Sequence, residues 1–266
     1  MTPPFLAVVV PAYNEEERIA ASLEKLVEYL SVQPYTWEIV VADDGSTDDT
    51  ASIAAGVSKR WPAIRVIKLP HKGKGSAIRA GMLATDAEWR FLCDADLSMP
   101  PEQLDRFLPG GVPPVEEIVI GSREAPGARR IGEPSRRHII GRSFTIAVWL
   151  LAFRGIEDTQ CGFKLFRGDV AERIFQRQTL DGFGFDVEVL FMARKMGASI
   201  REQAIDWYYH PGSKVTLLKG LSGFLDIVRV RLNWALGKYR GLGRVTAARD
   251  RVNADDGRED GTRDEQ

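Results

Sequence analysis

Short apolar runs alternate with helical patterns through the first half of the chain. The runs at 5–10, 37–42, 64–69, 89–93 and 118–120 are rich in β-branched or aromatic residues. In the segments between them, apolar residues recur at helical spacing. Strands that alternate with helices are joined by right-handed crossovers and form a parallel sheet with both faces covered. The pattern therefore predicts an α/β fold.

The second half of the chain has a less regular pattern. An apolar stretch at 144–153 predicts a buried helix. From 217 to 236 the apolar residues fall on one face of a helix, which has basic residues around its edges and carries Trp234. Such an amphipathic helix suits a membrane interface. No stretch of the sequence reaches the roughly 18–20 apolar residues that a bilayer-spanning helix needs.

Composition indicates one large domain with a polar tail. The 266 residues are 44% hydrophobic and carry a formal charge of -1, so the chain can bury a full core and has no global basic field for nucleic acid. We expect a domain at 1–243, which includes a membrane-interface segment at 215–240. The remaining residues, 244–266, are too polar to bury a core and are expected to be disordered.

The two cysteines and the amino terminus indicate a reducing compartment. Cys93 and Cys161 lie far apart without C-x-x-C spacing, which argues against a disulfide framework and a zinc site. The sequence enters its first strand without a basic segment followed by an apolar signal region. We therefore expect a cytoplasmic protein that lies peripherally on the inner face of the membrane.

Two acidic segments follow neighbouring strands of the predicted sheet. Residues 43–48 follow the second strand, and Asp94 and Asp96 follow the fourth. Carboxylates at the carboxyl ends of parallel strands converge on one crevice, where open α/β sheets bind their ligands. Asp94 and Asp96 offer the oxygen ligands that Mg²⁺ and Mn²⁺ prefer. The sequence thus predicts a metal-bound nucleotide here, and a solvated acidic turn is the alternative.

Asp43 and Asp44 suit recognition of the nucleotide itself. Ionised carboxylates can accept hydrogen bonds from a uracil N–H and from ribose hydroxyls at neutral pH. Capping of the following helix is the rival role for either residue. Further along, the glycine-rich segment 71–76 contains Lys74 and could cradle a phosphate. It lacks the residue order of a P-loop, and a plain glycine-rich start of a helix explains it equally well.

Arginines are concentrated between 123 and 142. Guanidinium groups bind phosphate through two hydrogen bonds and keep their charge, so this segment suits an anionic acceptor. A solvated basic loop is the other interpretation. The arginines are Arg123, Arg129, Arg130, Arg136, Arg137 and Arg142, and the acids within the segment are Glu124 and Glu133.

Together, the segments 10–15, 43–46 and 94–96 resemble motifs of the family-2 inverting glycosyltransferases. These enzymes have the GT-A nucleotide-sugar fold and include the polyprenyl-phosphate sugar synthases. The resemblance runs from Val8 to about Lys238. The later segments 158–166 and 185–188 are similar to the dolichyl-phosphate β-glucosyltransferase branch and less similar to the mannose-transferring one.

The resemblance implies an activity and its partners. UDP-glucose would be the donor, a polyprenyl monophosphate of the dolichyl type the acceptor, and a β-linked lipid-phosphate sugar the product. The implied fold is a mostly parallel sheet flanked by helices, with amphipathic helices near the carboxyl end. No counterpart of the amino-terminal membrane anchor of the eukaryotic members is recognisable in the sequence. Attachment to a membrane surface would then come from the amphipathic segment or from a partner.

The resemblance also assigns roles to individual residues. Asp96 would bind the metal directly, with Asp94 on the ribose or on the waters of the metal. Asp186 would orient the glucose hydroxyls, act as a base towards a hydroxyl acceptor, or cap a helix. Asp158 and Gln160 would line the sugar pocket or form a structural turn. Arg123 and Arg137 would bind the acceptor phosphate with help from Lys214, while the nucleotide would contact Pro11, Ala12, Tyr13, Glu15, Asp43, Asp44 and Lys74.

Other functions stay open at this point. The same mechanism could use GDP-mannose or another UDP-hexose, or could transfer the sugar to a polysaccharide hydroxyl. A nucleotidyltransferase would share the sheet and the acidic metal site, but it usually has a glycine- and arginine-rich loop where this chain has residues 11–15. A non-catalytic scaffold on membranes would need only the amphipathic helix.

Overall fold

The computed structural model describes residues 2–209 and 217–245, and within them the side chains of all residues except 135–140 and 217–222. Lys214, the side chain of Arg137 and nearly all of the expected tail at 244–266 lie outside the described part.

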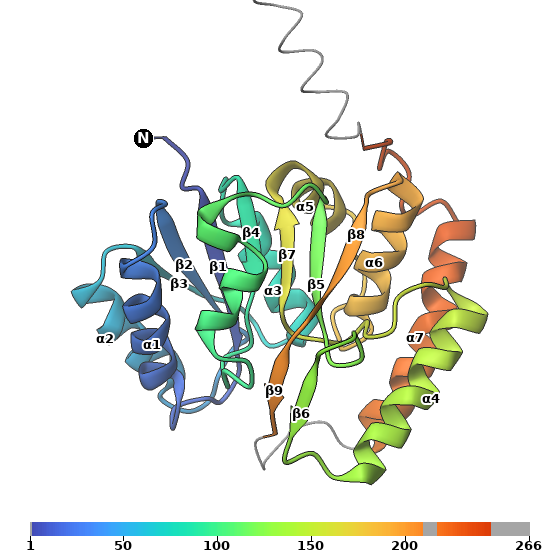
Figure 1. Cartoon of the computed structure of the whole chain (residues 1–266), viewed down its shortest axis with the longest axis horizontal. Helices are drawn as coiled ribbons and strands as arrows, with labels where there is room; N and C mark the ends of the chain where they lie inside the picture. Colours follow the sequence, from blue (N-terminus) through green and yellow to red (C-terminus); the bar gives the residue numbers. More distant parts are fainter. Residues whose placement is uncertain (1, 210–216, 246–266) are drawn as a thin grey trace, which may run out of the picture.

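A seven-stranded sheet forms the centre of the molecule, in the order β3-β2-β1-β4-β7-β5-β8 (Figure 1). The five strands expected from the sequence are its strands β1 to β5, and β1 to β4 run parallel as expected. Strand β7 is antiparallel to both of its neighbours, β4 and β5. A small second sheet pairs β6 with β9. The strands are β1 (Leu6–Ala12), β2 (Trp37–Asp43), β3 (Ile64–Lys68), β4 (Trp89–Leu92), β5 (Ile118–Ser122), β6 (Arg129–Ile131), β7 (Lys164–Arg167), β8 (Ile200–Ala204) and β9 (Asp206–Tyr208).

Both faces of the large sheet are covered by helices. Val8 and Val10 of β1 pack into one core with α1, α2 and the short helix η1, whereas Val9 packs into the other core with α3, α5 and α6. Because successive side chains of a strand point to opposite faces, a strand covered on both sides is apolar throughout. The helices are α1 (Ile19–Ser31), α2 (Thr50–Arg60), α3 (Lys74–Leu83), η1 (Pro101–Arg106), η2 (Pro109–Gly111), α5 (Gly168–Phe175) and α6 (Phe185–Met196).

Helices α4 (Ser135–Leu151) and α7 (Leu217–Ala235) lie side by side at the end of the molecule away from α1 and α2 (Figure 1). Their contacts include the rings of Phe144 and Phe224, 5.4 Å apart, and a hydrogen bond from Arg231 Nε to Leu151 O. The helix expected to be buried at 144–153 corresponds to the second half of α4, which ends at 151, and only one of its faces is buried. Among the described residues, no helix is both long enough and apolar enough to cross a membrane.

Gly81 and Gly56 offer a matched pair of substitutions that tests the packing of α3 on β1. A Cβ at Gly81 of α3 would lie 2.4 Å from Val9 Cγ1, whereas a Cβ at Gly56 of α2 would meet nothing within 4 Å. Overpacking a core costs about 1–3 kcal/mol, and alanine in place of glycine within a helix gains about 0.5–1 kcal/mol. We expect Gly81→Ala to lower the free energy of unfolding in urea and Gly56→Ala to raise it. If both variants changed the free energy of unfolding by the same amount, this packing of α3 on β1 would be contradicted.

Candidate active site

The two acidic segments meet at one edge of the sheet, where β2 and β4 end on either side of β1. Asp44 is buried, and its carboxylate accepts hydrogen bonds from Lys72 N at 3.0 Å and Gly73 N at 2.9 Å. The next residue, Lys74, places its Nζ 2.6 Å from Asp94 Oδ1. The segment 72–74 therefore bridges the two aspartates, and both lie at the same edge as parallel strands require.

Two glycines allow this close approach. Gly45 has φ +69°, and a Cβ there would lie 2.7 Å from His71 N. Gly73 has φ +131°, a backbone conformation that other residues rarely adopt, and a Cβ there would lie 2.5 Å from Asp181 O. The glycine-rich segment at 71–76 is thus required by backbone geometry as well as by its position beside the acids.

Lys74 is surrounded by acidic side chains. Burial lowers the pKa of its ammonium, but Asp94, Asp186 and Asp96 outweigh this and hold the pKa above its ordinary value. Gly162 adjoins the same cluster, because a Cβ there would lie 2.0 Å from Asp94 Oδ2. Any larger residue at 162 would displace the carboxylate that pairs with Lys74.

A second lysine enters the site from the antiparallel strand. Lys164 is fully buried at the start of β7, opposite Leu92, the last residue of β4, and Ile120 of β5 in the ladder. Its Nζ lies 2.5 Å from Asp186 Oδ1 and donates to Cys161 O. Burial raises the pKa of Asp186 even though Lys164 and Lys74 act to lower it. Lys164 thereby orients Asp186 at the beginning of α6.

A divalent cation fits this arrangement if the ligand supplies part of its coordination. In the described part of the chain, no three His, Cys, Asp or Glu side chains are grouped to hold a metal. Asp94 and Asp96 are nevertheless adjacent to an ammonium, and Asp96 is held in place by a hydrogen bond from Ser98 N at 2.9 Å. Mg²⁺ is commonly bound by one or two carboxylates together with phosphate oxygens of a substrate. The two aspartates match that donor set.

The end of β1 forms the other side of this edge. Pro11 and Ala12 are buried, and Ala12 O accepts a hydrogen bond from Asp44 N at 2.8 Å. Tyr13 stacks on His71 with ring centroids 4.2 Å apart. Glu15 N donates to a hydroxyl at the start of α2, at 2.7 Å. The loop after β1 is therefore joined to the loop after β2.

Asp43 brings an unsatisfied acceptor to this edge. The side chain is 2% exposed, and its Oδ2 accepts a weak bond from Ser46 N at 3.3 Å. Its Oδ1 is buried and has no hydrogen-bond partner within the described structure. Buried polar atoms are nearly always satisfied, so this oxygen indicates a missing donor.

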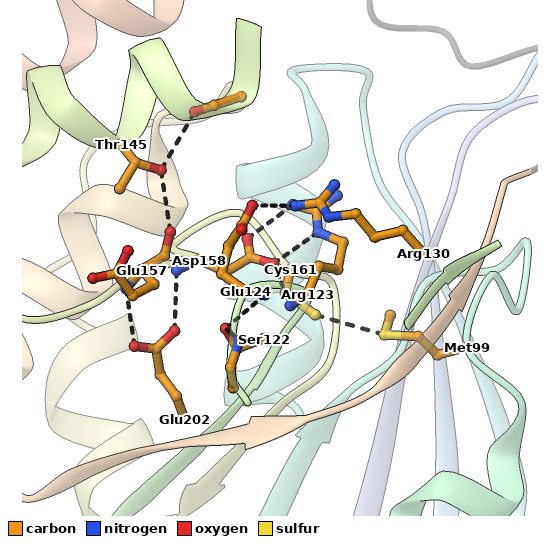
Figure 2. A network of polar contacts seen from close by, with 12 residues as sticks. Met99, Ser122, Arg123, Glu124, Arg130, Thr145, Glu157, Asp158, Cys161 and Glu202 are labelled. Carbon is orange, nitrogen blue, oxygen red and sulfur yellow. Dashed lines mark hydrogen bonds and ion pairs between the residues drawn. The ribbon is translucent and has the colours of Figure 1, made fainter. Parts of the chain in front are cut away.

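Arg123 follows the last residue of β5 and forms an ion pair with Asp158 (Figure 2). Its Nε and Nη2 donate to the two oxygens of Asp158 at 2.7 and 2.8 Å, and its backbone N donates at 3.0 Å. The carboxylate of Glu202 in turn accepts from the backbone N of Glu157 and Asp158. Although burial opposes it, Arg123 lowers the pKa of Asp158 to about 2. Gln160, the other candidate from this segment, is exposed.

The arginine-rich segment is less cationic in space than in sequence. Acids from distant segments pair with it: Asp206 lies 2.6 Å from Arg129 Nη2, and Glu157 lies 2.9 Å from Arg142 Nη1. Glu124 and Glu133, which belong to the segment, each lie 2.5 Å from Arg130. Arg137 has no described side chain. The arginines with described side chains in this segment therefore already have carboxylate partners. To bind an acceptor phosphate, as the sequence predicts, they would have to share or exchange these partners.

Three residues at this edge were not singled out by the sequence analysis: His71, Gly162 and Lys164. A signal for Lys164 exists, because it stands between Phe163 and Leu165 in a buried strand, where a lysine needs an acidic partner. His71 and Gly162 lie within the segments 71–76 and 158–166, but nothing in the sequence assigned either residue a contact of its own. Their importance comes from contacts with residues that lie 27 and 68 positions away in the chain, Asp44 and Asp94.

Asp158→Asn tests the buried ion pair. The variant leaves Arg123 buried without its carboxylate, which costs about 3–5 kcal/mol of unfolding free energy. Because the folded-state pKa of Asp158 is lowered to about 2, its contribution is complete above about pH 4 and is lost as pH falls towards 2. We expect the difference between wild type and variant in urea to shrink by about 1–2 kcal/mol between pH 7 and pH 2.5.

The control for this prediction is Asp169→Asn, which removes a half-exposed partner of Arg167. An exposed pair contributes at most about 1 kcal/mol, so this variant should unfold nearly as the wild type does. A difference for Asp158→Asn that stays constant with pH would contradict the ionisation assigned to Asp158.

The sequence is similar to a known family and to relatives with assigned names. The family described as "Glycosyl transferase family 2" matches residues 7–175. The dolichyl-phosphate beta-glucosyltransferase of Homo sapiens is 35% identical over 250 residues, which covers 88% of this chain and 77% of the relative. The enzyme of the same name from Saccharomyces cerevisiae is 32% identical over 259 residues, covering 89% and 77%.

Solved structures show the same fold at lower identity. Mannosyl-3-phosphoglycerate synthase from Rubrobacter xylanophilus matches with a TM-score of 0.65 at 18% identity, over 88% of this chain and 76% of that one. Glucosyl-3-phosphoglycerate synthase from Mycobacterium tuberculosis matches with a TM-score of 0.62 at 19% identity, over 85% and 80%. These similarities confirm the expected GT-A fold. The chain belongs to glycosyl transferase family 2 and is a glycosyltransferase.

Proposed function

We propose that this protein transfers glucose from UDP-glucose to a polyprenyl monophosphate of the dolichyl type, with inversion at the anomeric carbon. The observation that carries the proposal is the cluster of Lys74, Asp94, Asp96 and Asp186. This cluster lies at the same edge of the sheet as Asp43 and Asp44. The names of the relatives support the sugar and the acceptor, since the similarity covers most of the chain.

The nucleotide would bind between the loops that follow β1 and β2. The buried Oδ1 of Asp43 can accept the N–H of a uracil, which would supply its missing donor. Asp44 would reach the nucleoside while it holds the segment 72–73 in place. Tyr13 and His71 form an aromatic stack beside these loops, and a base would extend this stack as a further ring.

The diphosphate would bind beside Lys74. With Lys164, which pairs with Asp186, this cluster has three carboxylates and two ammonium groups. It is therefore net negative and would repel a diphosphate without a further cation. Asp96 and Asp94 would hold Mg²⁺ or Mn²⁺, which when bound neutralises the leaving diphosphate. Lys74 would leave Asp94 and donate to a phosphate oxygen. The mycobacterial synthase has been crystallised with Mn²⁺ and UDP-glucose.

The acceptor would need an anion site more than a general base. A lipid monophosphate has its second pKa near 6 and is largely ionised at neutral pH. Asp186 is then free to orient the glucose hydroxyls, a role that suits a carboxylate fixed by Lys164. Arg123 would meet the acceptor phosphate with the edge of its guanidinium that Asp158 does not occupy, and Arg137 would add a second cation.

The exposed face of α4 and α7 would attach the enzyme to the inner surface of the membrane. Large apolar side chains on these helices stay exposed, and the basic residues Arg229, Arg231 and Lys238 are exposed with them. A basic apolar surface of this kind binds anionic bilayers. The exposed apolar residues are Ile146, Leu150 and Leu151 on α4, Leu225, Val228, Leu232 and Trp234 on α7, and Leu236 after it.

Product analysis tests the proposed reaction. Purified protein with Mn²⁺ should transfer labelled glucose from UDP-glucose to a short polyprenyl phosphate in β linkage, and should not use GDP-mannose or the unphosphorylated polyprenol. Asp96→Asn should lower the rate at least about a hundredfold, as expected for a group that stabilises developing charge. Asp86→Asn, an exposed acid before β4, should keep the wild-type rate. Absence of transfer from UDP-glucose would refute the donor.

Vesicle flotation tests the membrane surface. We expect the protein to float with vesicles of phosphatidylcholine and phosphatidylglycerol. Leu232→Ser should bind about tenfold more weakly, because one leucine no longer enters the apolar layer. The control is Val32→Ser, which changes a side chain that is 79% exposed at the end of α1. If both variants bind as the wild type does, α7 is not the attachment surface.

A further inference from the structure

Glu188 is a buried carboxylate that is satisfied by uncharged donors. It lies on α6 and is fully buried. Its oxygens accept hydrogen bonds from Thr179 N at 3.0 Å, Leu180 N at 2.9 Å and the hydroxyl of Tyr239 at 2.7 Å. No lysine or arginine in the described structure forms an ion pair with it. A buried charge of this kind is tolerated only while its donors stay in position.

The segment that Glu188 holds is hydrogen-bonded to the first turn of α3. Ser76 N donates to Asp181 O at 3.1 Å. Gln178 Nε2 donates to Gly75 O at 2.9 Å. These bonds join residues 178–181 to the residues on the carboxyl side of Lys74.

The two segments are also in van der Waals contact on both sides of Lys74. A Cβ at Gly73 would lie 2.5 Å from Asp181 O, and a Cβ at Gly75 would lie 2.6 Å from Leu180 O. Backbones packed this closely cannot shift independently. The position of the Lys74 backbone therefore depends on the position of residues 180–181.

Helix α7 and the residues after it also contact Glu188 and Thr179. Asn233 Nδ2 donates to Thr179 Oγ1 at 2.9 Å, and the same hydroxyl donates to Glu188. Tyr239 is 2% exposed, so its hydroxyl is fixed by packing as well as by its bond to Glu188.

We propose that Glu188 is a positioning residue for Lys74. It fixes residues 178–181, these fix the first turn of α3, and that turn aims the Lys74 ammonium at the diphosphate of the donor. Glu188 touches neither donor nor acceptor in this arrangement. The last step rests on the function proposed above, whereas the first two are properties of the protein alone.

Hydrogen exchange of the ligand-free protein tests the first two steps. In Glu188→Gln the charge is removed and one carboxylate oxygen becomes an NH₂ group. The amide oxygen can keep the bonds from Thr179 N and Leu180 N, but the NH₂ group then faces the hydroxyls of Thr179 and Tyr239, so the bonds that these hydroxyls donate to the carboxylate are lost. We expect the amides of residues 73–77 to exchange about tenfold faster or more, relative to those of β2. Tyr239→Phe removes one donor to Glu188 and should give a smaller increase in the exchange rate at the same amides. This second variant provides the test if Glu188→Gln folds poorly.

Glu117→Gln is the matched control. Glu117 is 3% exposed and accepts bonds from Ser199 N and Oγ and from Arg167 Nη1, but it stands before β5, at the opposite edge of the sheet. It undergoes the same chemical change and should leave exchange at 73–77 unchanged relative to β2. Unchanged exchange at 73–77 in both Glu188→Gln and Tyr239→Phe would overturn the proposal.

Donor affinity tests the last step. With Mn²⁺ present, Glu188→Gln should raise the dissociation constant of UDP-glucose about tenfold, the equivalent of one weakened charge-assisted hydrogen bond. In a Lys74→Met background it should cause no further loss, because the group that it positions is gone. Additive losses would show a general structural effect and refute the positioning role. A wild type that does not bind UDP-glucose would refute the proposed function and leave the exchange result to decide on Glu188.

Discussion

The ion pair between Lys74 and Asp94 connects the two halves of the site. Lys74 begins α3, whose preceding backbone is held by Asp44 at the end of β2, whereas Asp94 follows β4. One contact of 2.6 Å thus joins the carboxyl ends of strands that lie on either side of β1. Excess negative charge around the ammonium keeps it protonated and leaves the cluster able to accept a further cation. The chemistry proposed for the donor depends on this balance, because an anionic diphosphate has to enter a group of carboxylates.

The antiparallel strand β7 brings a second group of site residues to the same edge. Because it runs against β4 and β5, its amino-terminal end lies where their carboxyl ends lie. Lys164 therefore reaches Asp186, Gly162 contacts Asp94, and the segment before them places Asp158 on Arg123. A parallel strand in this position would have turned these residues to the opposite edge. The direction of one short strand thus decides which residues would surround the sugar in the proposed function.

Strands β1 to β5 and the meeting of the acidic segments could be predicted because both follow from local patterns, whereas β6 to β9 were not predicted. Buried parallel strands are continuous apolar runs, and their carboxyl ends share an edge whatever the loops do. The strand β7 was missed because it is only four residues long and begins with a lysine. The partners of the arginines were missed for a different reason: Asp158 and Asp206 lie 35 and 77 residues from the arginines they bind. Charge counted along the sequence overstated the cationic character of 123–142, and only the fold shows which of these charges are already neutralised.

A crystal structure of the protein with UDP and Mn²⁺ would test the central claim most directly. The account predicts that the diphosphate lies between the ends of β2 and β4, that Asp96 binds the cation, and that Lys74 Nζ has left Asp94 for a phosphate oxygen. UDP bound elsewhere on the molecule, with the Lys74–Asp94 pair intact, would contradict it.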